Sequence, residues 1–125
     1  MKLYLFVTAL LLTLPTLSFA QDRESAATRS PEDMSVDERM AMMKTAAKYD
    51  NCIYSEAISQ VGAFPDIRQA VDFAMGECLA KLTDLEKSIV AMGFEADYAN
   101  AFSKRVRNHA ARKILPELAV RKSGG

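Results

Sequence analysis

From Met34 onward, apolar residues recur at three- and four-residue spacing, which is the period of amphipathic α-helices. No stretch of useful length alternates apolar and polar residues as a half-buried strand would. The first helix is expected to begin after Ser35, because Ser35 and Glu38 have the spacing of a capping box, and to end at Gly62. Its narrowest apolar stripe, and therefore its expected core face, consists of Val36, Met40, Met43, Ala47, Tyr54, Ile58 and Val61. This stripe is widened by Met42, Ala46, Ile53 and Ala57.

A second helix is expected from about Asp66 to Met92, with one apolar face along its whole length. Pro65 stands where a new helix can begin, and Gly93 suits a left-handed C-terminal cap. Thr83 has the sequence context of an N-cap, which allows a kink at that point. The expected core face consists of Ile67, Ala70, Val71, Ala74, Cys78, Leu82, Leu85, Ile89 and Met92.

A third helix is expected from about Glu95 to Leu115. Because Pro116 has no amide hydrogen, at most one further turn is expected over residues 117–120, and residues 121–125 are expected to form a disordered tail. Three main helices with short connections predict an all-α antiparallel bundle, or four helices if the first or the second is broken. The expected core stripe of the third helix consists of Ala99, Phe102, Val106, Ala110 and Ile114.

The N-terminal residues have the layout of a secretory signal peptide. Lys2 precedes an apolar run, and small residues at positions 18 and 20 mark a cleavage site after residue 20. The alternative is an uncleaved membrane anchor, since residues 3–20 are close to the minimum length of a membrane span, but Pro15 argues against it. Residues 21–33 are polar and are expected to form a flexible leader before a helical domain at 34–120. No later apolar run is long enough to span a bilayer, so we expect no stable membrane insertion after cleavage. The chain has no N-glycosylation sequon, which favours the bacterial periplasm over a eukaryotic secretory route.

Cys52 and Cys78 are the two cysteines of the chain, and both are equidistant from residue 65 in the expected turn. Residues equidistant from the turn of an antiparallel helical hairpin lie at similar heights along it. Because the export signal directs the chain to a compartment where disulfides form, we predict one disulfide between the two cysteines. Cys52 lies off the expected core stripe of its helix, and a bend near Asp50 would re-aim it. Asp50 itself lies within that stripe and must find a partner, reach solvent at an edge or mark a break. The alternatives are two unpaired buried thiols or a metal site, although no second Cys or His has suitable spacing.

Catalytic motifs are absent from the sequence. There is no glycine-rich phosphate loop, HExxH, CxxC or GxSxG motif, and His109 is the only histidine. A pair of carboxylates acting on a glycosidic bond stays an alternative, but most Asp and Glu residues fall on expected polar faces. We therefore expect no enzymatic activity, no cofactor and no metal site.

Four methionines cluster at the start of the first helix. Thioethers bind Cu(I) because both partners are soft, but they also fill cores and form adaptable docking surfaces. Core packing is the favoured interpretation, with a partner groove and copper binding as the alternatives. The cluster consists of Met34, Met40, Met42 and Met43.

The charge of the chain is unevenly distributed. Sixteen basic and sixteen acidic residues cancel overall, but residues 104–125 carry about +6 and residues 21–103 about −7. A basic flank with an aromatic end suits a protein partner with an acidic surface, or an anionic envelope polymer. Cations near a helix C-terminus also complement its dipole, and they could pair with acids on other helices. Nucleic acid is not an expected partner of an exported, neutral chain. The candidate binding face on the third helix consists of Tyr98, Arg105, His109 and Arg112.

The general plan is a signal peptide followed by about a hundred helical residues and one disulfide. It resembles several groups of small bacterial periplasmic proteins, among them immunity proteins and acid-stress chaperones, in architecture but not in any motif. Our first hypothesis is a non-enzymatic binding protein of the periplasm, such as an inhibitor of, or immunity protein for, another protein. The alternative is an acid- or envelope-stress chaperone, followed by methionine-based copper handling.

Overall fold

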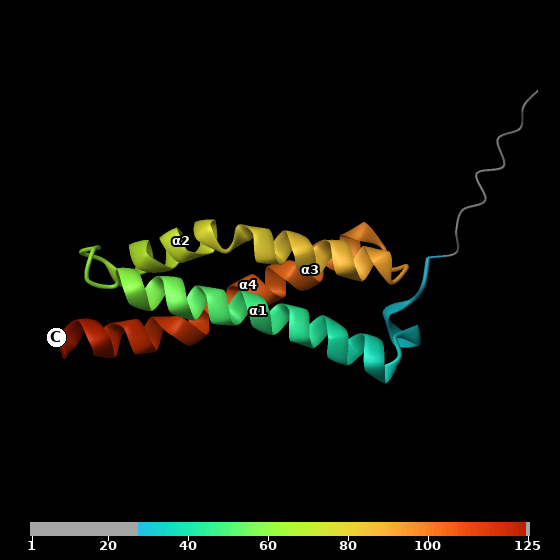
Figure 1. Cartoon of the computed structure of the whole chain (residues 1–125), viewed down its shortest axis with the longest axis horizontal. Helices are drawn as coiled ribbons and strands as arrows, with labels where there is room; N and C mark the ends of the chain where they lie inside the picture. The colour runs from blue at the N-terminus through green and yellow to red at the C-terminus, as the bar shows by residue number, and fades with distance from the viewer. Residues whose placement is uncertain (1–27, 125) are drawn as a thin grey trace, which may run out of the picture.

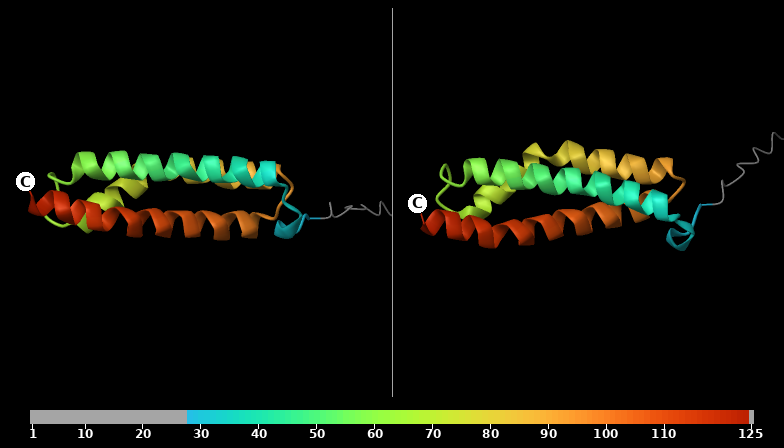
Figure 2. Two further views of the ribbon diagram at one scale, coloured as in Figure 1. Left: turned by 90° about the horizontal axis from the view of Figure 1, so that it is seen from below. Right: turned by 60° about the horizontal axis from the view of Figure 1, so that its bottom comes forward.

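The computed structural model describes residues 28–124, so the expected signal peptide and residues 21–27 of the expected leader lie outside the described residues. The described chain folds into four α-helices packed together, which confirms the predicted all-α bundle in its four-helix form. Figure 1 shows α2 and α3 following each other along one line, antiparallel to α1, with α4 running in the same direction as α1. Figure 2 shows the same three rods from two further sides. The elements are a short 3-10 helix η1 (Pro31–Asp33), α1 (Val36–Gln60), α2 (Ile67–Glu77), α3 (Leu79–Ala91) and α4 (Ala96–Ser123).

Helix α1 is unbroken, and its predicted core face is confirmed only in part. The residues expected to widen the stripe are buried, whereas most of the narrow stripe itself is exposed. The buried side lies roughly a quarter-turn around the helix from the predicted stripe, at 100° per residue. The alanines on the buried side of α1, like those on α2 and α4, are small and allow the helices to approach closely. Periodicity in the sequence does not measure this fit, and it favours the more regular stripe. The side that faces the core consists of Met42, Ala46, Tyr49, Ile53 and Ala57. The exposed residues of the predicted stripe are Val36, Met40, Met43, Ala47 and Tyr54.

The predicted core face of the second helix is confirmed, although the helix is divided in two. Ala70, Leu85 and Ile89 are fully buried on this face, whereas Ile67 and Met92 at its two ends are partly buried. The division falls at Cys78, whose backbone lies outside the helical region (φ −92°, ψ 3°), and not at Thr83. Gly76, a weak helix former, stands just before the division and lowers the cost of the break.

The predicted disulfide between Cys52 and Cys78 is confirmed, with their Cα atoms 5.9 Å apart. Because the core side of α1 is centred near Tyr49 and Ile53, Cys52 borders that side and reaches Cys78 without any bend at Asp50. The disulfide therefore joins the middle of α1 to the junction between α2 and α3.

Helix α4 is longer than the sequence predicts. It continues through Pro116 to Ser123, where a helix end near residue 115 and a disordered tail were expected. Leu118, beyond the proline, is fully buried, and packing of this kind overrides the lost backbone hydrogen bond. Lys122 donates hydrogen bonds to the carbonyl oxygens of Val61 and Phe64 in the α1–α2 loop, which holds the last turn in place.

The residues just before α1 are held against the bundle by Arg29. Its guanidinium forms two hydrogen bonds to the carboxylate of Glu38, at 2.6 and 2.9 Å, and one to the carbonyl oxygen of Met92. It also lies 4.7 Å from the centre of the Phe94 ring. Residues 28–33, the end of the expected flexible leader, thus contact the α3–α4 loop. There Gly93 has the predicted left-handed conformation (φ +93°).

Among residues 28–124, no helix is both long enough and apolar enough to span a bilayer.

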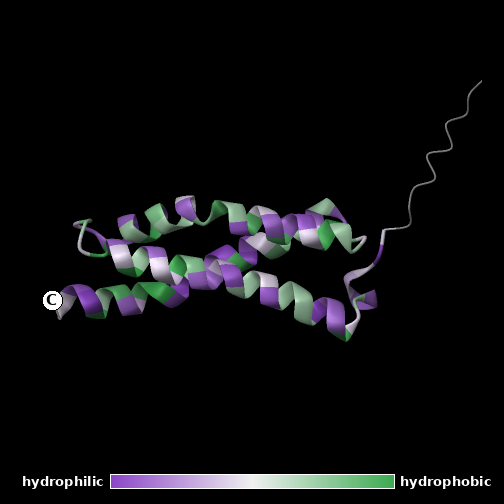
Figure 3. Ribbon diagram, in the orientation of Figure 1, coloured by the Kyte–Doolittle hydropathy of each residue, from purple (hydrophilic) through white to green (hydrophobic). Residues whose placement is uncertain are grey.

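Figure 3 shows polar and apolar segments alternating along the visible side of each helix. On α1, exposed apolar residues such as Val36 and Met40 lie outside the core.

Candidate binding face between α1 and α4

The outer side of α1 carries a row of exposed apolar side chains, which we call the apolar ridge. Val36, Met40 and Met43 are 74%, 65% and 56% exposed, and Tyr54 is 46% exposed. Val36, Met40, Met43 and Ala47 follow one side of the helix at three- and four-residue spacing, and Tyr54 follows on the same side seven residues later, beyond Asp50. An exposed apolar row of this kind on a small domain is typical of an interaction surface. The ridge is the same stripe that the sequence assigns to the core.

The neighbouring side of α4 carries the predicted candidate face, which we call the basic flank: Tyr98, Arg105, His109 and Arg112. Their spacing places all four on one side of the helix, with Tyr98 half-buried and the other three exposed. The guanidinium of Arg105 lies 5.6 Å from the centre of the Phe102 ring. The ion pairs of the described chain are Arg29–Glu38 and Arg121–Glu117, so within it the basic flank has no acidic partner.

Near the N-terminal ends of α1 and α4, a groove of about 400 Å³ joins the methionine cluster to the basic flank. Met34 and Met42 form part of its buried wall, whereas Met43 lies on its exposed side. Ring contacts continue the aromatic wall from Phe94 to Tyr98 (5.8 Å between centroids) and from Tyr98 to Phe102 (6.4 Å). We call this hollow the methionine groove, and its lining consists of Pro31, Glu32, Met34, Arg39, Met42, Met43, Tyr98, Phe102 and Arg105.

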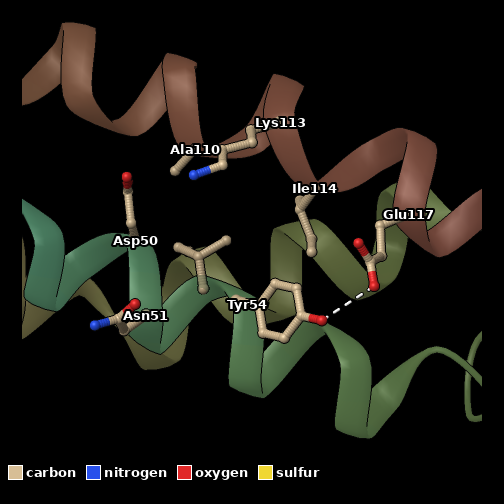
Figure 4. Close-up of a pocket in the computed structure, with 8 residues that line it drawn as sticks. Asp50, Asn51, Tyr54, Ala110, Lys113, Ile114 and Glu117 are labelled. Carbon is tan, nitrogen blue, oxygen red and sulfur yellow. Dashed lines mark hydrogen bonds between the residues drawn. The ribbon is translucent and has the colours of Figure 1, made fainter.

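Farther along the same two helices lies a cavity of about 140 Å³, which we call the central cavity (Figure 4). At one end, the Tyr54 hydroxyl donates a 3.0 Å hydrogen bond to Glu117, and Arg121 donates to Glu117 as well. These hydrogen bonds, the one from Arg121 first, lower the pKa of the Glu117 carboxyl below its usual value. The lining consists of Asp50, Asn51, Ile53, Tyr54, Ala110, Lys113, Ile114 and Glu117.

At the other end of the central cavity, Asp50 projects from α1 (Figure 4). Its Oδ1 atom is buried and has no hydrogen-bond partner in the described chain. The Lys113 side chain lines the same cavity, but no ion pair joins it to Asp50. Of the outcomes that the sequence leaves open for Asp50, the helix break is therefore wrong, and the carboxylate lies at the α1–α4 boundary.

The structure brings only part of the predicted binding face into a hollow. Tyr98 and Arg105 line the methionine groove, whereas His109 and Arg112 line neither this groove nor the central cavity. Sequence reasoning missed Arg39 as a groove residue and placed Phe102 in the core, where it is half-buried. A detectable signal was the four-residue spacing from Tyr98 to Phe102, which puts two aromatic rings on one side of α4.

In the described part of the chain, no three His, Cys, Asp or Glu side chains gather where they could hold a metal ion. The clustered thioethers are divided, with Met34 and Met42 buried and Met40 and Met43 exposed. No family model, curated protein or solved structure matches the chain.

Proposed function

We propose that the chain is a small exported, non-enzymatic binding protein of the bacterial periplasm, and that it docks an amphipathic helix of another protein. The observation that carries this proposal is the methionine groove, where Met43 of the exposed apolar ridge on α1 lies with Tyr98 and Arg105 of the unpaired basic flank on α4. An inhibitor or immunity protein would work through such a face. The signal-peptide layout of the sequence and the disulfide support export.

The shape of the face suits a helix better than an extended strand. The ridge from Val36 to Tyr54 spans roughly 27 Å at 1.5 Å per residue, which matches a partner helix of about 18 residues. Its three- and four-residue spacing matches the apolar stripe of such a helix. Methionines adapt their shape to different apolar partners, so Met40 and Met43 suit a docking surface.

The charge of the face selects an acidic partner. Arg39 and Arg105 line the methionine groove, and Arg112 lies farther along the same side of α4. Unpaired cations beside an apolar row favour a helix that carries Asp or Glu along the edges of its apolar stripe. Electrostatic attraction of this kind weakens as salt concentration rises, which gives the proposal a measurable signature.

The test uses two synthetic helical peptides with identical leucine stripes, one flanked by Glu and the other by Lys. We expect the oxidised mature chain to bind the acidic peptide with a Kd on the order of tens of micromolar, measured by fluorescence anisotropy. Added salt should weaken this binding, and the basic peptide should bind at least about tenfold more weakly.

Matched variants locate the binding surface. Met40→Ser with Met43→Ser should weaken binding of the acidic peptide at least about tenfold. Leu79→Ser with Val90→Ser changes two equally exposed apolar residues of α3 and should leave the affinity unchanged. Equal losses from both pairs, or no binding of either peptide, would overturn the proposal. The chaperone hypothesis would be favoured instead if the protein bound unfolded polypeptides only at acid pH and regardless of their charge.

A further inference from the structure

The chain has few side chains that react readily with oxidants. It has no Trp, and its two cysteines are joined to each other. The methionine thioethers are therefore the readily oxidised sulfur atoms of the exported chain. Their reactivity depends on solvent access, so the exposure of each methionine determines the order in which they react.

Exposure divides the methionines of α1 sharply. Met40 and Met43 are 65% and 56% exposed, whereas Met42, between them in sequence, is 4% exposed. Met34 is 7% exposed, and Met75 and Met92 are partly buried against the core. The two most accessible thioethers among residues 28–124 thus stand next to each other on the apolar ridge.

We infer that Met40 and Met43 are an oxidant-sensitive modification site, and that their conversion to sulfoxides by hypochlorous acid or a peroxide switches off docking at the α1–α4 face. The inference rests on the proposed function. With hypochlorous acid, a sulfur–oxygen bond forms and the oxygen–chlorine bond breaks. Two electrons pass from sulfur to chlorine, and chloride and a proton are released. The product is a polar sulfoxide in place of an apolar thioether.

The fold should survive this modification, because neither sulfur contributes to the core. Polar sulfoxide oxygens on the ridge remain in water in the unbound protein but would have to lose that water against a leucine stripe. Burial of an unpartnered polar group is unfavourable, so the modification weakens docking selectively. Methionine sulfoxide reductases reverse the reaction, which makes the site a switch.

The experiment treats the oxidised mature chain with limiting hypochlorous acid and maps the added oxygen by mass spectrometry of peptides. We expect Met40 and Met43 to be modified first and Met34 and Met42 several-fold more slowly. Circular dichroism should be unchanged, affinity for the acidic peptide should fall at least about tenfold, and reductase treatment should restore it. Equal modification of all four sites would overturn the site assignment.

A matched variant separates this site from other oxidised positions. Met40→Leu with Met43→Leu keeps the ridge apolar but removes both thioethers, so the affinity of this variant for the acidic peptide should be the same before and after oxidant treatment. The variant Met34→Leu with Met42→Leu should lose affinity for the acidic peptide on oxidation to the same extent as the unmodified sequence. A response that persists in the first variant would overturn the inference while leaving the proposed function intact. If the untreated chain binds no peptide, the proposed function fails, and the oxidation map alone still tests the site.

Discussion

The Oδ1 atom of Asp50 is reached by neither solvent nor a hydrogen-bond donor, although α1 continues through it without a break. A buried polar atom without a partner costs about 1–3 kcal/mol, more when it is charged. A residue kept at such a cost is typical of positions where function opposes stability. Asp50 is therefore the residue whose replacement should most improve the fold.

We predict that Asp50→Ala raises the free energy of unfolding by about 1–2 kcal/mol in urea titrations. Asp72→Ala is the matched control, because Asp72 is exposed in the middle of α2 and the two changes gain similar helix propensity. If Asp50→Ala raises the free energy of unfolding no more than Asp72→Ala does, the Asp50 carboxylate has a hydrogen-bond partner in solution.

At the scale of single residues, sequence predicts local contacts and misses distant ones. Ser35 was predicted as an N-cap because its partner, Glu38, lies three residues away, and both hydrogen bonds of the capping box form. Arg29 was assigned to a flexible leader, since its contacts with Met92 and Phe94 join residues more than sixty positions apart. Only the folded arrangement of α3 and α4 creates those partners.

At the scale of elements, the ion pair between Arg29 and Glu38 is one of the contacts that hold the segment before α1 against the bundle. The hydrogen bond from Arg29, followed by one from the Ser35 amide, lowers the pKa of the Glu38 carboxyl to about 2. Because the pKa is lower in the folded chain than in the unfolded chain, this pair stabilises the fold fully above pH 4.5. Its contribution is lost as the pH falls from about 4.5 towards about 2.

We predict that Arg29→Gln lowers stability at neutral pH and flattens the dependence of stability on pH in this range. The measurement is the urea midpoint at a series of pH values between pH 2 and pH 6, where the unmodified chain should lose stability more steeply. Arg39→Gln, which removes an exposed arginine outside the ion pairs of the described chain, should keep the steep dependence. Parallel curves for all three proteins would contradict the prediction.

Elements with one apolar face were easier to predict than α1, which has two. The stripe from Ala70 to Ile89 is the sole regular apolar pattern on its segment, and it became the core. On α1, the ridge and the side through Tyr49 both have helical spacing. Periodicity cannot tell which of the two packs inside, because that choice depends on how the other helices fit. The missed apolar ridge and the misplaced centre of the α1 core face therefore have one cause.

At the scale of the whole molecule, stability depends strongly on the disulfide. A ring closed between residues 26 positions apart is worth about 3–4 kcal/mol in the chain-entropy model, against a typical total of 5–15 kcal/mol. We predict that Cys52→Ala with Cys78→Ala lowers the free energy of unfolding by about this amount in urea titrations. Reduction of the unmodified chain should give a similar loss, and an unchanged midpoint in both cases would contradict the prediction.

The three main helical segments and the disulfide between two of them were predicted from the sequence, whereas the length of α4 was not. Local rules stop a helix near Pro116, but burial of Leu118 and the contacts of Lys122 with the α1–α2 loop extend it. Such contacts exist only once α1 and α4 lie side by side, and the same is true of the methionine groove.

The loop between α1 and α2 lies inside the ring that the disulfide closes. A protease that cleaves once between Gly62 and Ala63 would therefore produce two polypeptides that still migrate as one species until a thiol reagent separates them. The cleaved protein would keep both halves of the α1–α2 pairing within reach of each other, so damage at this exposed turn does not by itself release either helix.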